Sequence, residues 1–351
     1  MRIEATAPTR IDLAGGTMDI YPLYLFLEGG ITVNAGIDLV SKVTIETRDS
    51  GPIVLRSIDT GAEAQADSAH RLSMEGPMGF VARIVRFYPP CCPVTITTQN
   101  TVPHGSGLGA SSSLLIALSG ALNALNGTGH SYDQFVDWGA NVEAQAIGIP
   151  TGKQDYYAAL YGRVNAIWFQ IKSNRVEPLA EDEEDLKWLE DRVVLTFTGE
   201  SHFSGTSNWN MLKAYIEDLG NNRDSMKAIK ETALAMREAI LARDLRQFST
   251  LVDTEWQDRR QLAEGVSTPQ IERLMQAARD AGALASKICG AGGGGCMITV
   301  VESGLKDKVA QALQQAGATH LPFRISRTGL QVSTSQRECV GVIHRVWGGG
   351  G

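Results

Sequence analysis

The segment 103–115 reads PHGSGLGASSSLL, and its composition decides how the rest of the chain is interpreted. Three glycines, Gly105, Gly107 and Gly109, remove side chains from a loop that leads directly into apolar residues with helical spacing. The first backbone N–H groups of a helix have no intrahelical partner and the helix dipole is positive there, so this loop predicts an anion-binding turn. A flexible Gly/Ser connection is the alternative, but linkers rarely run straight into a leucine-faced helix.

Two other phosphate-binding patterns fit this chain poorly. The loop matches G-x-G-x-x-A by letter, but Pro103 interrupts the approach from the preceding strand, and a helix begins where that fingerprint requires an acidic strand residue. The segment GIPTGKQ (148–154) has the wrong spacing for a Walker A loop and lacks a hydroxyl residue after Lys153. The sequence therefore predicts neither a Rossmann site nor a P-loop.

Length and charge limit the class of protein. The chain has 351 residues, 43% hydrophobic and 20% charged, which is ample for packed cores and, at ~150 residues per domain, favours two domains. Its net charge of −7 disfavours nucleic acid and anionic membranes as partners. No apolar run reaches the ~18–20 residues of a transmembrane helix, and the N-terminus shows no signal-like stretch. We therefore expect a soluble, cytoplasmic protein.

Strand-like and helical patterns alternate along the chain. Strands are expected within 1–47 and at 94–100, 192–199, 296–301 and 321–333. Helices are expected at 114–127, 131–148 (opened by a Ser131/Gln134 capping box), several stretches up to 264, 269–282 and 305–317. The acidic stretch 177–191 is either a seam between domains or a solvated helix. The pattern predicts an α+β protein with domains at 1–185 and 186–347.

Glycine-rich turns recur at two other places. The segment 288–301, ICGAGGGGCMITVV, brings the backbone close to a phosphate or another backbone, or forms only a tight crossover. The segment 7–24, APTRIDLAGGTMDIYPLY, places Arg10 and Asp19 on either side of a glycine pair. A carboxylate beside a bare turn suits hydroxyl binding, because it accepts two bonds from vicinal diols; an ordinary turn aspartate is an equal alternative.

A pair of carboxylates lies in the segment 141–162. Glu143 ends a helix, and Asp155 follows a turn that contains glycine and proline. The two can converge on one pocket, where the neighbouring Lys153 would keep Asp155 ionised. On spacing alone, a surface salt bridge is an equal alternative to a catalytic pair.

Together and in this order, the four segments resemble the superfamily of galactose, homoserine, mevalonate and phosphomevalonate kinases, the GHMP kinases. The 103–115 loop is similar to that family's ATP-phosphate motif, and 288–301 is similar to its C-terminal glycine motif. Finer detail in RIDLAGGTMDI, GKQDYYAALYG and KICGAGGGGCMITV resembles the branch that phosphorylates the anomeric hydroxyl of D-glycero-D-manno-heptose 7-phosphate. The resemblance implies the GHMP kinase fold, with an N-terminal domain like domain 2 of ribosomal protein S5 and a ferredoxin-like C-terminal domain.

The resemblance also implies an ATP- and Mg²⁺-dependent sugar kinase with assigned residues. Asp155 would accept the sugar hydroxyl proton, and Arg10 or Lys153 would keep it charged and neutralise the transferring phosphoryl group. Ser111 and Glu143 would hold Mg²⁺. The residues implied at the ATP phosphates are Pro103, Gly105, Ser106, Gly107, Leu108, Gly109, Ala110, Ser111 and Ser112. Those implied at the sugar are Gly16, Thr17, Asp19, His202, Gly292, Gly293 and Gly294.

One departure bears on the substrate. The loop 197–209 resembles the heptose-kinase pattern T-G-x-x-R-x-S, but His202 replaces the arginine. Arginine suits a phosphomonoester because its charge is permanent and its donors form a planar fork, whereas histidine is mostly neutral at pH 7. This favours an unphosphorylated sugar, such as a hexose or uronic acid, with a heptose 7-phosphate as the close alternative.

Two other functions stay open at this point. A catalytically silent sugar sensor on the same fold would not need Asp155, Glu143 and Ser111 together. A kinase of mevalonate-like or amino-acid substrates is disfavoured because Asp19 after a double glycine suits a polyol. The expected partner is a small-molecule sugar, with no nucleic acid and no membrane, and a homodimer is an open assembly state.

Overall fold

The computed structural model describes residues 1–201 and 204–335, and it contains two β-sheets. The larger sheet is eight-stranded, with the order β12-β1-β2-β5-β3-β4 and with β6 and β7 extending from β2. The smaller sheet is four-stranded, with the order β11-β8-β10-β9. The strands of the larger sheet are β1 (Arg2–Ala14), β2 (Gly30–Thr47), β3 (Ile53–Ser57), β4 (Glu63–Ala66), β5 (Val94–Asn100), β6 (Val164–Phe169), β7 (Arg175–Ala180) and β12 (Gln331–Ser335). Those of the smaller sheet are β8 (Val193–Phe197), β9 (Ala285–Ile288), β10 (Cys296–Val300) and β11 (Thr319–His320).

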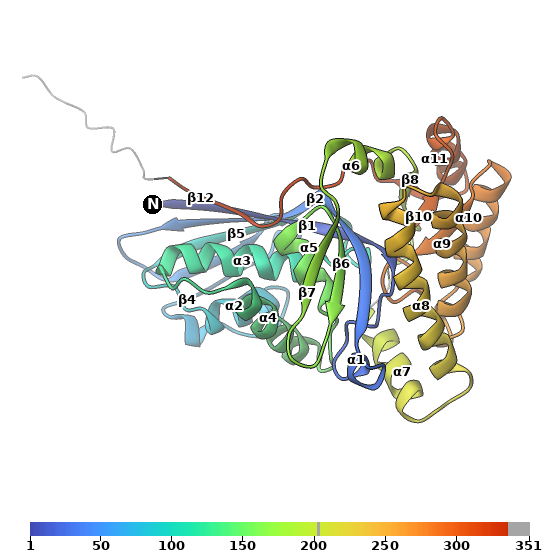
Figure 1. Cartoon of the computed structure of the whole chain (residues 1–351). Helices are drawn as coiled ribbons and strands as arrows, with labels where there is room; N and C mark the ends of the chain where they lie inside the picture. The colour runs from blue at the N-terminus through green and yellow to red at the C-terminus, as the bar shows by residue number, and fades with distance from the viewer. Residues whose placement is uncertain (202–203, 336–351) are drawn as a thin grey trace, which may run out of the picture.

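Helices cover these sheets in two groups (Figure 1). Five belong to the half with the larger sheet: α1 (Leu23–Phe26), α2 (Gly79–Phe87), α3 (Ala110–Asn126), α4 (Tyr132–Ile147) and α5 (Gln154–Tyr161). A short 3₁₀ turn lies at Ala69–Arg71. The others are α6 (Glu183–Glu190), α7 (Ser204–Ile216), α8 (Asn222–Leu241), α9 (Leu245–Arg259), α10 (Pro269–Asp280) and α11 (Lys306–Gln315). The α+β expectation is confirmed.

The predicted helix after the 103–109 loop forms as α3. Leu114, Leu115, Leu118, Leu122 and Leu125 are all buried along it and pack into the core beneath the larger sheet. The helix ends at Gly127, whose left-handed φ of 63° lets its N–H bond back to Asn123. The helix-spaced leucines and the terminal glycine therefore act as the sequence pattern predicted.

Helix α4 also begins and ends as predicted. The Ser131 side chain accepts a bond from the Gln134 N–H, and the Gln134 side chain accepts one from the Ser131 N–H, which completes the capping box. The acidic stretch forms β7 and then α6, whose Leu186 and Leu189 are buried while its acidic residues lie in the first turn. A helix therefore forms over residues 183–190 of this stretch, while 177–180 end a strand, and a domain seam here stays a prediction.

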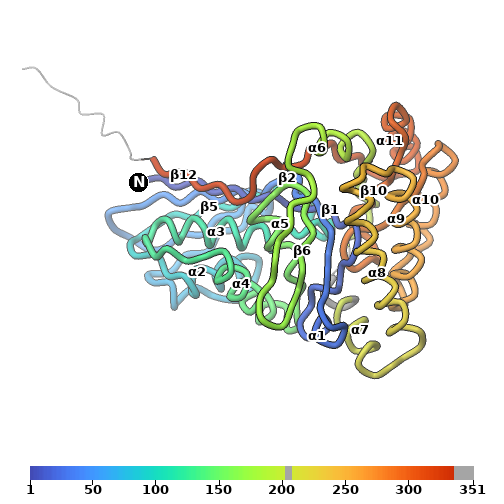
Figure 2. The backbone as a smooth tube through the Cα atoms, in the orientation of Figure 1, coloured from blue at the N-terminus to red at the C-terminus, as the bar shows by residue number. Residues whose placement is uncertain are grey.

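Two features differ from the expectations. No helix was predicted after the glycine- and proline-containing turn, but the structure forms α5 there, and Asp155 lies in its first turn. The last strand, β12, pairs with β1 through Arg2–Thr6 and so returns to the first sheet, as the tube in Figure 2 shows. The domain limits 1–185 and 186–347 stay a prediction.

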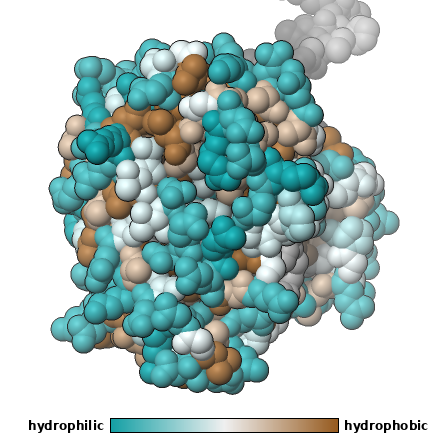
Figure 3. Space-filling model, turned by 90° about the vertical axis from the view of Figure 1, so that its right-hand side faces the viewer, coloured by the Kyte–Doolittle hydropathy of each residue, from teal (hydrophilic) through white to brown (hydrophobic). Residues whose placement is uncertain are grey.

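A second apolar core joins the halves. It contains residues of β1, β2 and β6 together with residues of α6, α8, α9 and the smaller sheet. Viewed from the side of the C-terminal helices, the surface is mainly hydrophilic with scattered apolar residues (Figure 3). The continuous core fixes the end of β1 against α9, and this is where most of the predicted site residues meet.

Candidate functional site

The loop 103–109 approaches the rest of the chain so closely at two of its glycines that neither position has room for a side chain. Gly107 and Gly109 have φ values of 71° and 74°, in the left-handed region that favours glycine. A Cβ atom on Gly107 would lie 2.8 Å from the carbonyl oxygen of Cys289, and one on Gly109 would lie 2.8 Å from Cγ of Asp155. The predicted phosphate loop therefore lies directly against the predicted catalytic carboxylate.

Arg10 joins this loop to Asp155. Its Nη1 donates to the carbonyl oxygen of Gly107 at 2.6 Å, and its Nε donates to Oδ1 of Asp155 at 2.7 Å. Its backbone N–H also donates to the Leu108 carbonyl at 3.0 Å. The β1–β2 register shifts on either side of this stretch, after Pro8 and after Asp12, as irregular pairing often does near sites. Arg10 is thus the cation that the structure places at Asp155.

Lys153 does not take the place predicted for it. Its Nζ lies 2.8 Å from Oδ1 of Asp137 on α4, whereas the salt-bridge partner of Asp155 is Arg10. Lys153 is the N-cap residue of α5, and its side chain leaves the helix toward α4. The idea that Lys153 keeps Asp155 ionised is therefore wrong in its geometry.

The side chain of Asp155 is partly buried, with 20% of it exposed. Burial raises the pKa of Asp155 above its ordinary value, and the charge and hydrogen bond of Arg10 offset only part of that rise. The net direction is upward, because desolvation outweighs the opposite effect of Arg10. A carboxylate with a raised pKa is a better proton acceptor near neutral pH than an ordinary one.

Glu143 is surrounded by hydroxyl groups. Ser111 Oγ donates to its Oε1 at 2.5 Å, Ser112 Oγ donates to its Oε2 at 2.9 Å, and the Tyr156 hydroxyl also donates to Oε2. Burial raises the pKa of Glu143, and these donors offset part of the rise. Tyr156, the residue after Asp155 in α5, is a contact that was not predicted from the sequence.

The pair Ser111 and Glu143 fits the predicted Mg²⁺. Hydroxyl and carboxylate oxygens are the hard ligands that this ion prefers, and these two already lie within hydrogen-bond distance at the start of α3. Within residues 1–201 and 204–335, no group of three or more His, Cys, Asp or Glu could hold a metal ion. An ion here would complete its shell with phosphate oxygens and water, as Mg²⁺ usually does.

The predicted acceptor loop is folded against α5. Asp19 Oδ2 accepts a hydrogen bond from the backbone N–H of Gln154 at 2.9 Å, at the N-terminus of the helix that presents Asp155. Burial raises the pKa of Asp19 to about 6; the nearby Asp155 raises it too, and the bond from Gln154 lowers it. Gly152 packs so tightly on the Asp19 carboxylate that a Cβ would collide with it. Asp19 and Asp155 therefore share one end of α5.

The glycine run after β9 packs against backbone. Gly293 N–H donates to the Val266 carbonyl, Gly295 N–H to that of Glu200, and Cys296 N–H to that of Ser106, each at 2.7 Å. The crossover alternative thus accounts for much of the run, and it brings the run beside the phosphate loop. The roles of Gly292, Gly293 and Gly294 at a sugar stay predictions. His202 lies outside the described residues.

Four buried charges were missed. Asp12, Glu255, Arg259 and Lys287 have side chains that are 0% exposed and paired with one another. Two of them lie inside segments quoted for other reasons, RIDLAGG and KICGAGGGG, and the other two have the i,i+4 spacing of a helical ion pair on α9. That spacing was the available signal, but nothing in it indicated complete burial.

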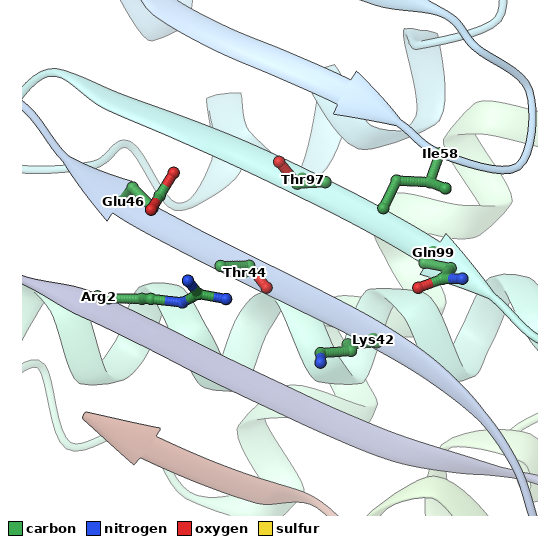
Figure 4. A pocket seen from close by; sticks show the side chains of 7 residues that line it. All are labelled: Arg2, Lys42, Thr44, Glu46, Ile58, Thr97 and Gln99. Atoms are coloured by element: carbon green, nitrogen blue, oxygen red, sulfur yellow. The ribbon is translucent and has the colours of Figure 1, made fainter. Parts of the chain in front are cut away.

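Among the hollows of the described part of the chain, two are lined neither by Arg10 or Asp155 nor by the four buried charges. One, of about 250 Å³, is on the face of the larger sheet turned away from α3, and none of the predicted site residues lines it (Figure 4). It is lined by Arg2, Lys42, Thr44, Glu46, Ile58, Thr97 and Gln99. The other, also of about 250 Å³, is polar and takes in Lys153, Asp137, Tyr24 and the turn between β6 and β7.

Among the described residues, no helix combines the length and apolarity needed to cross a membrane.

Comparison with known proteins matches both halves of the chain to one family. Residues 77–163 match the model of the GHMP kinases N terminal domain, and residues 236–319 match that of the GHMP kinases C terminal domain. The D-glycero-alpha-D-manno-heptose 7-phosphate kinase of Campylobacter jejuni is 29% identical over 345 residues, covering 94% of this chain and 98% of that protein. The mevalonate kinase of Thermococcus sibiricus is 28% identical over 356 residues, covering 95% and 98%.

A solved structure agrees over nearly the whole length. A D-glycero-D-manno-heptose 1-phosphate kinase from Bacteriodes thetaiotaomicron superposes with a TM-score of 0.77 at 27% identity, covering 95% of this chain and 99% of that one. The fold implied by the sequence resemblance is therefore confirmed.

Proposed function

The chain belongs to the GHMP kinase family, and from this premise we propose that it transfers the γ-phosphoryl group of ATP to a hydroxyl, the anomeric one, of a heptose-like sugar or sugar phosphate. One observation carries the proposal: Asp155 lies against Gly109 of the glycine loop and is paired with Arg10, which also bonds the loop at Gly107. A proton acceptor, a cation and a helix N-terminus thus converge on one point. The two heptose-phosphate kinases among the relatives support a sugar acceptor.

The proposed roles follow from these positions. ATP phosphates would lie along the loop 103–109 and the first turn of α3, where backbone N–H groups meet anions. Asp155 would accept the proton of the attacking hydroxyl, and Arg10 would face the negative charge of the transferring group. Such transfer depends mainly on positioning and charge stabilisation, so few catalytic groups suffice.

Mg²⁺ would be held by Ser111 and Glu143, and when bound it would neutralise charge on the ATP phosphates. The hydroxyls of Ser112 and Tyr156 hold Glu143 in place, because both donate to its Oε2. Asp19 would accept hydrogen bonds from sugar hydroxyls beside Asp155. Its pKa of about 6 leaves it mostly ionised at pH 7, the form that accepts such bonds.

The acceptor is identified by measuring ADP release with heptoses, hexoses, uronic acids and their phosphates, with mevalonate and homoserine as non-sugar comparisons. Acid lability and phosphorus NMR of the product distinguish an anomeric phosphate from one on another hydroxyl. Turnover of a non-sugar with no turnover of any sugar would overturn the sugar assignment. ATP binding without any turnover would favour the silent sensor.

Kinetics with a sugar and with its phosphorylated counterpart test whether the acceptor carries a distal phosphate. Because His202 replaces the arginine of the heptose-kinase pattern, we propose that the unphosphorylated member is turned over at least as well. A kcat/KM at least tenfold higher for the phosphorylated member, ~1.4 kcal/mol in transition-state binding, would contradict this. The acceptor would then be a heptose phosphate.

A further inference from the structure

The four buried charges form one continuous chain across the two halves of the protein. Lys287 on β9 lies 3.1 Å from Asp12 on β1 and 3.0 Å from Glu255 on α9. Glu255 in turn accepts two bonds from Arg259, at 2.9 Å from Nε and 2.5 Å from Nη2. The cluster holds two cations and two anions, so its charges balance inside the core.

The arginine at the end of this chain binds the acceptor loop. Arg259 Nη2 donates to the carbonyl oxygen of Gly16 at 2.8 Å, and its Nη1 donates to the Thr17 hydroxyl at 3.3 Å. Nη1 also reaches the carbonyl oxygen of Gly290 at 3.3 Å, in the glycine run. One planar guanidinium therefore fixes two of the glycine-rich segments at once, which a lysine ammonium could not do with the same geometry.

The backbone of this loop needs such a clamp. Thr17 has a φ of 80°, in the left-handed region that a β-branched residue avoids. Residues persist in such conformations only where the surroundings force them, and they concentrate at functional sites. Besides Arg259, the Thr17 hydroxyl contacts only one other described group by hydrogen bond, the sulfur of Met211.

The clamped turn is two residues from Asp19. Asp19 is bonded to the N-terminus of α5 and repels the neighbouring Asp155, which helps to raise its pKa. A loop that must hold Asp19 near the Asp155 carboxylate of α5 gains from a fixed cation network behind it. Asp12 shows the strength of that network: burial alone would raise its pKa, yet Lys287, Arg259 and Arg10 hold it below the ordinary value.

We propose that Arg259 is a positioning residue for the acceptor: its fork holds the Gly16–Thr17 turn so that Asp19 faces the same point as Asp155. The inference rests on the proposed function, because it takes this loop as the acceptor side of the site. Arg259 is fully buried and touches no substrate itself. Its loss displaces the acceptor loop and leaves the 103–109 loop, which Arg10 holds, in place.

The test is Arg259→Lys, which keeps the charge and removes the fork. The acceptor KM should rise at least tenfold, the ATP KM should stay within twofold, and amide hydrogen exchange in peptides covering 15–20 should accelerate. The matched control is Arg260→Lys, the next residue, whose 39%-exposed side chain pairs with Glu272 on the surface. The control should change neither KM nor the exchange.

Four results overturn or separate the claims. Equal rises in the two KM values, or a lower melting temperature with unchanged KM and unchanged exchange at 15–20, would reduce Arg259 to a structural role. If Arg259→Lys fails to fold, Glu255→Gln loosens the same guanidinium and should shift acceptor KM and exchange in the same direction, less strongly; no shift would overturn the proposal. A parent protein that phosphorylates no sugar refutes the proposed function, while the exchange comparison still decides whether Arg259 holds the loop.

Discussion

Two groups of buried charges meet on β1, two residues apart, and they differ in access. The pair Arg10–Asp155 is open enough that Asp155 keeps 20% of its side chain exposed. The group that begins at Asp12 is sealed, with every side chain at 0%. A carboxylate that exchanges a proton with a substrate must be reachable, whereas one that only fixes a loop need not be.

The difference in access also determines how much stability the protein loses when a member of each group is mutated. Removing one partner of a sealed ion pair leaves an uncompensated buried charge, which typically destabilises a protein by about 3–5 kcal/mol. Mutation of one member of the open pair should lower the stability of the protein less and lower kcat more. The two groups thus predict opposite patterns when mutated: Arg259→Lys and Glu255→Gln, described above, alter the sealed group, and the following changes alter the open pair and its surroundings.

The largest effect is expected on the open side. Asp155→Asn should lower kcat by roughly 10²–10⁴, because the amide cannot accept the hydroxyl proton. The variant keeps the shape of the side chain, so the melting temperature and ATP affinity should remain close to those of the parent. Steady-state ADP release and calorimetric ATP binding measure the two quantities. A rate within a few-fold of the parent would remove Asp155 from the mechanism.

The phosphate loop offers the next largest effect. ATP with Mg²⁺ should raise the melting temperature of the parent, and Gly107→Ala should abolish that shift, because its Cβ meets the Cys289 carbonyl at 2.8 Å. The control is Gly127→Ala at the other end of α3, where φ is also left-handed, at 63°, but no atom lies within 4 Å of an added Cβ. This control should lose about 1 kcal/mol of stability and keep the nucleotide shift. An intact shift in Gly107→Ala would contradict the loop assignment.

The raised pKa of Asp19 predicts that the stability of the protein depends on pH. Its folded pKa of about 6 lies above the ordinary 3.8, so the stability that its proton contributes is present below pH 4 and lost as the pH rises through 6. Relative to Asp19→Asn, the parent should lose about 2 kcal/mol of unfolding free energy between pH 4 and pH 7. Urea unfolding at several pH values measures this, with the exposed Asp133→Asn as control. A constant difference between parent and Asp19→Asn would show that Asp19 is not desolvated.

The smallest effect is expected for Lys153, which belongs to neither group. Its partner Asp137 is 63% exposed, and such pairs contribute about 0–1 kcal/mol. Lys153→Met should therefore change kcat less than threefold, whereas Arg10→Lys, which loses the fork between Gly107 and Asp155, should cost more than tenfold. Steady-state kinetics of the two variants, measured side by side, show which of the two cations contributes to kcat. A large loss in Lys153→Met alone would restore it to the chemistry.

Sequence patterns predicted those features that depend on contacts between residues close together in the chain. The glycines of 103–109, the leucine spacing of α3 and the capping box at Ser131 act within a few residues, and each forms as the sequence indicated. Helix α5 was missed because the Gly-Ile-Pro-Thr-Gly stretch before it is typical of a turn, and eight residues are too few for clear periodicity.

The sealed charges could not be predicted in the same way. Asp12 and Lys287 are flanked by apolar residues in the sequence, but charged side chains are usually exposed, so the sequence does not predict their burial. Their burial depends on a contact across 275 positions of sequence, which no local pattern contains. Lys153 illustrates the reverse error, since adjacency to Asp155 in sequence did not mean adjacency of the charged atoms.

The pairing of β12 with β1 has a consequence for how the chain reaches this fold. Residues 331–335 lie beside residues 2–6, so one edge of the larger sheet is completed only by a segment that the ribosome makes after both halves. Contacts this distant in sequence slow folding, because the loop must close before they stabilise anything. Until then β1 is an open edge strand, able to pair with other chains. Expression of a fragment that stops before β12 would therefore yield a protein prone to aggregation during synthesis, however complete its binding loops.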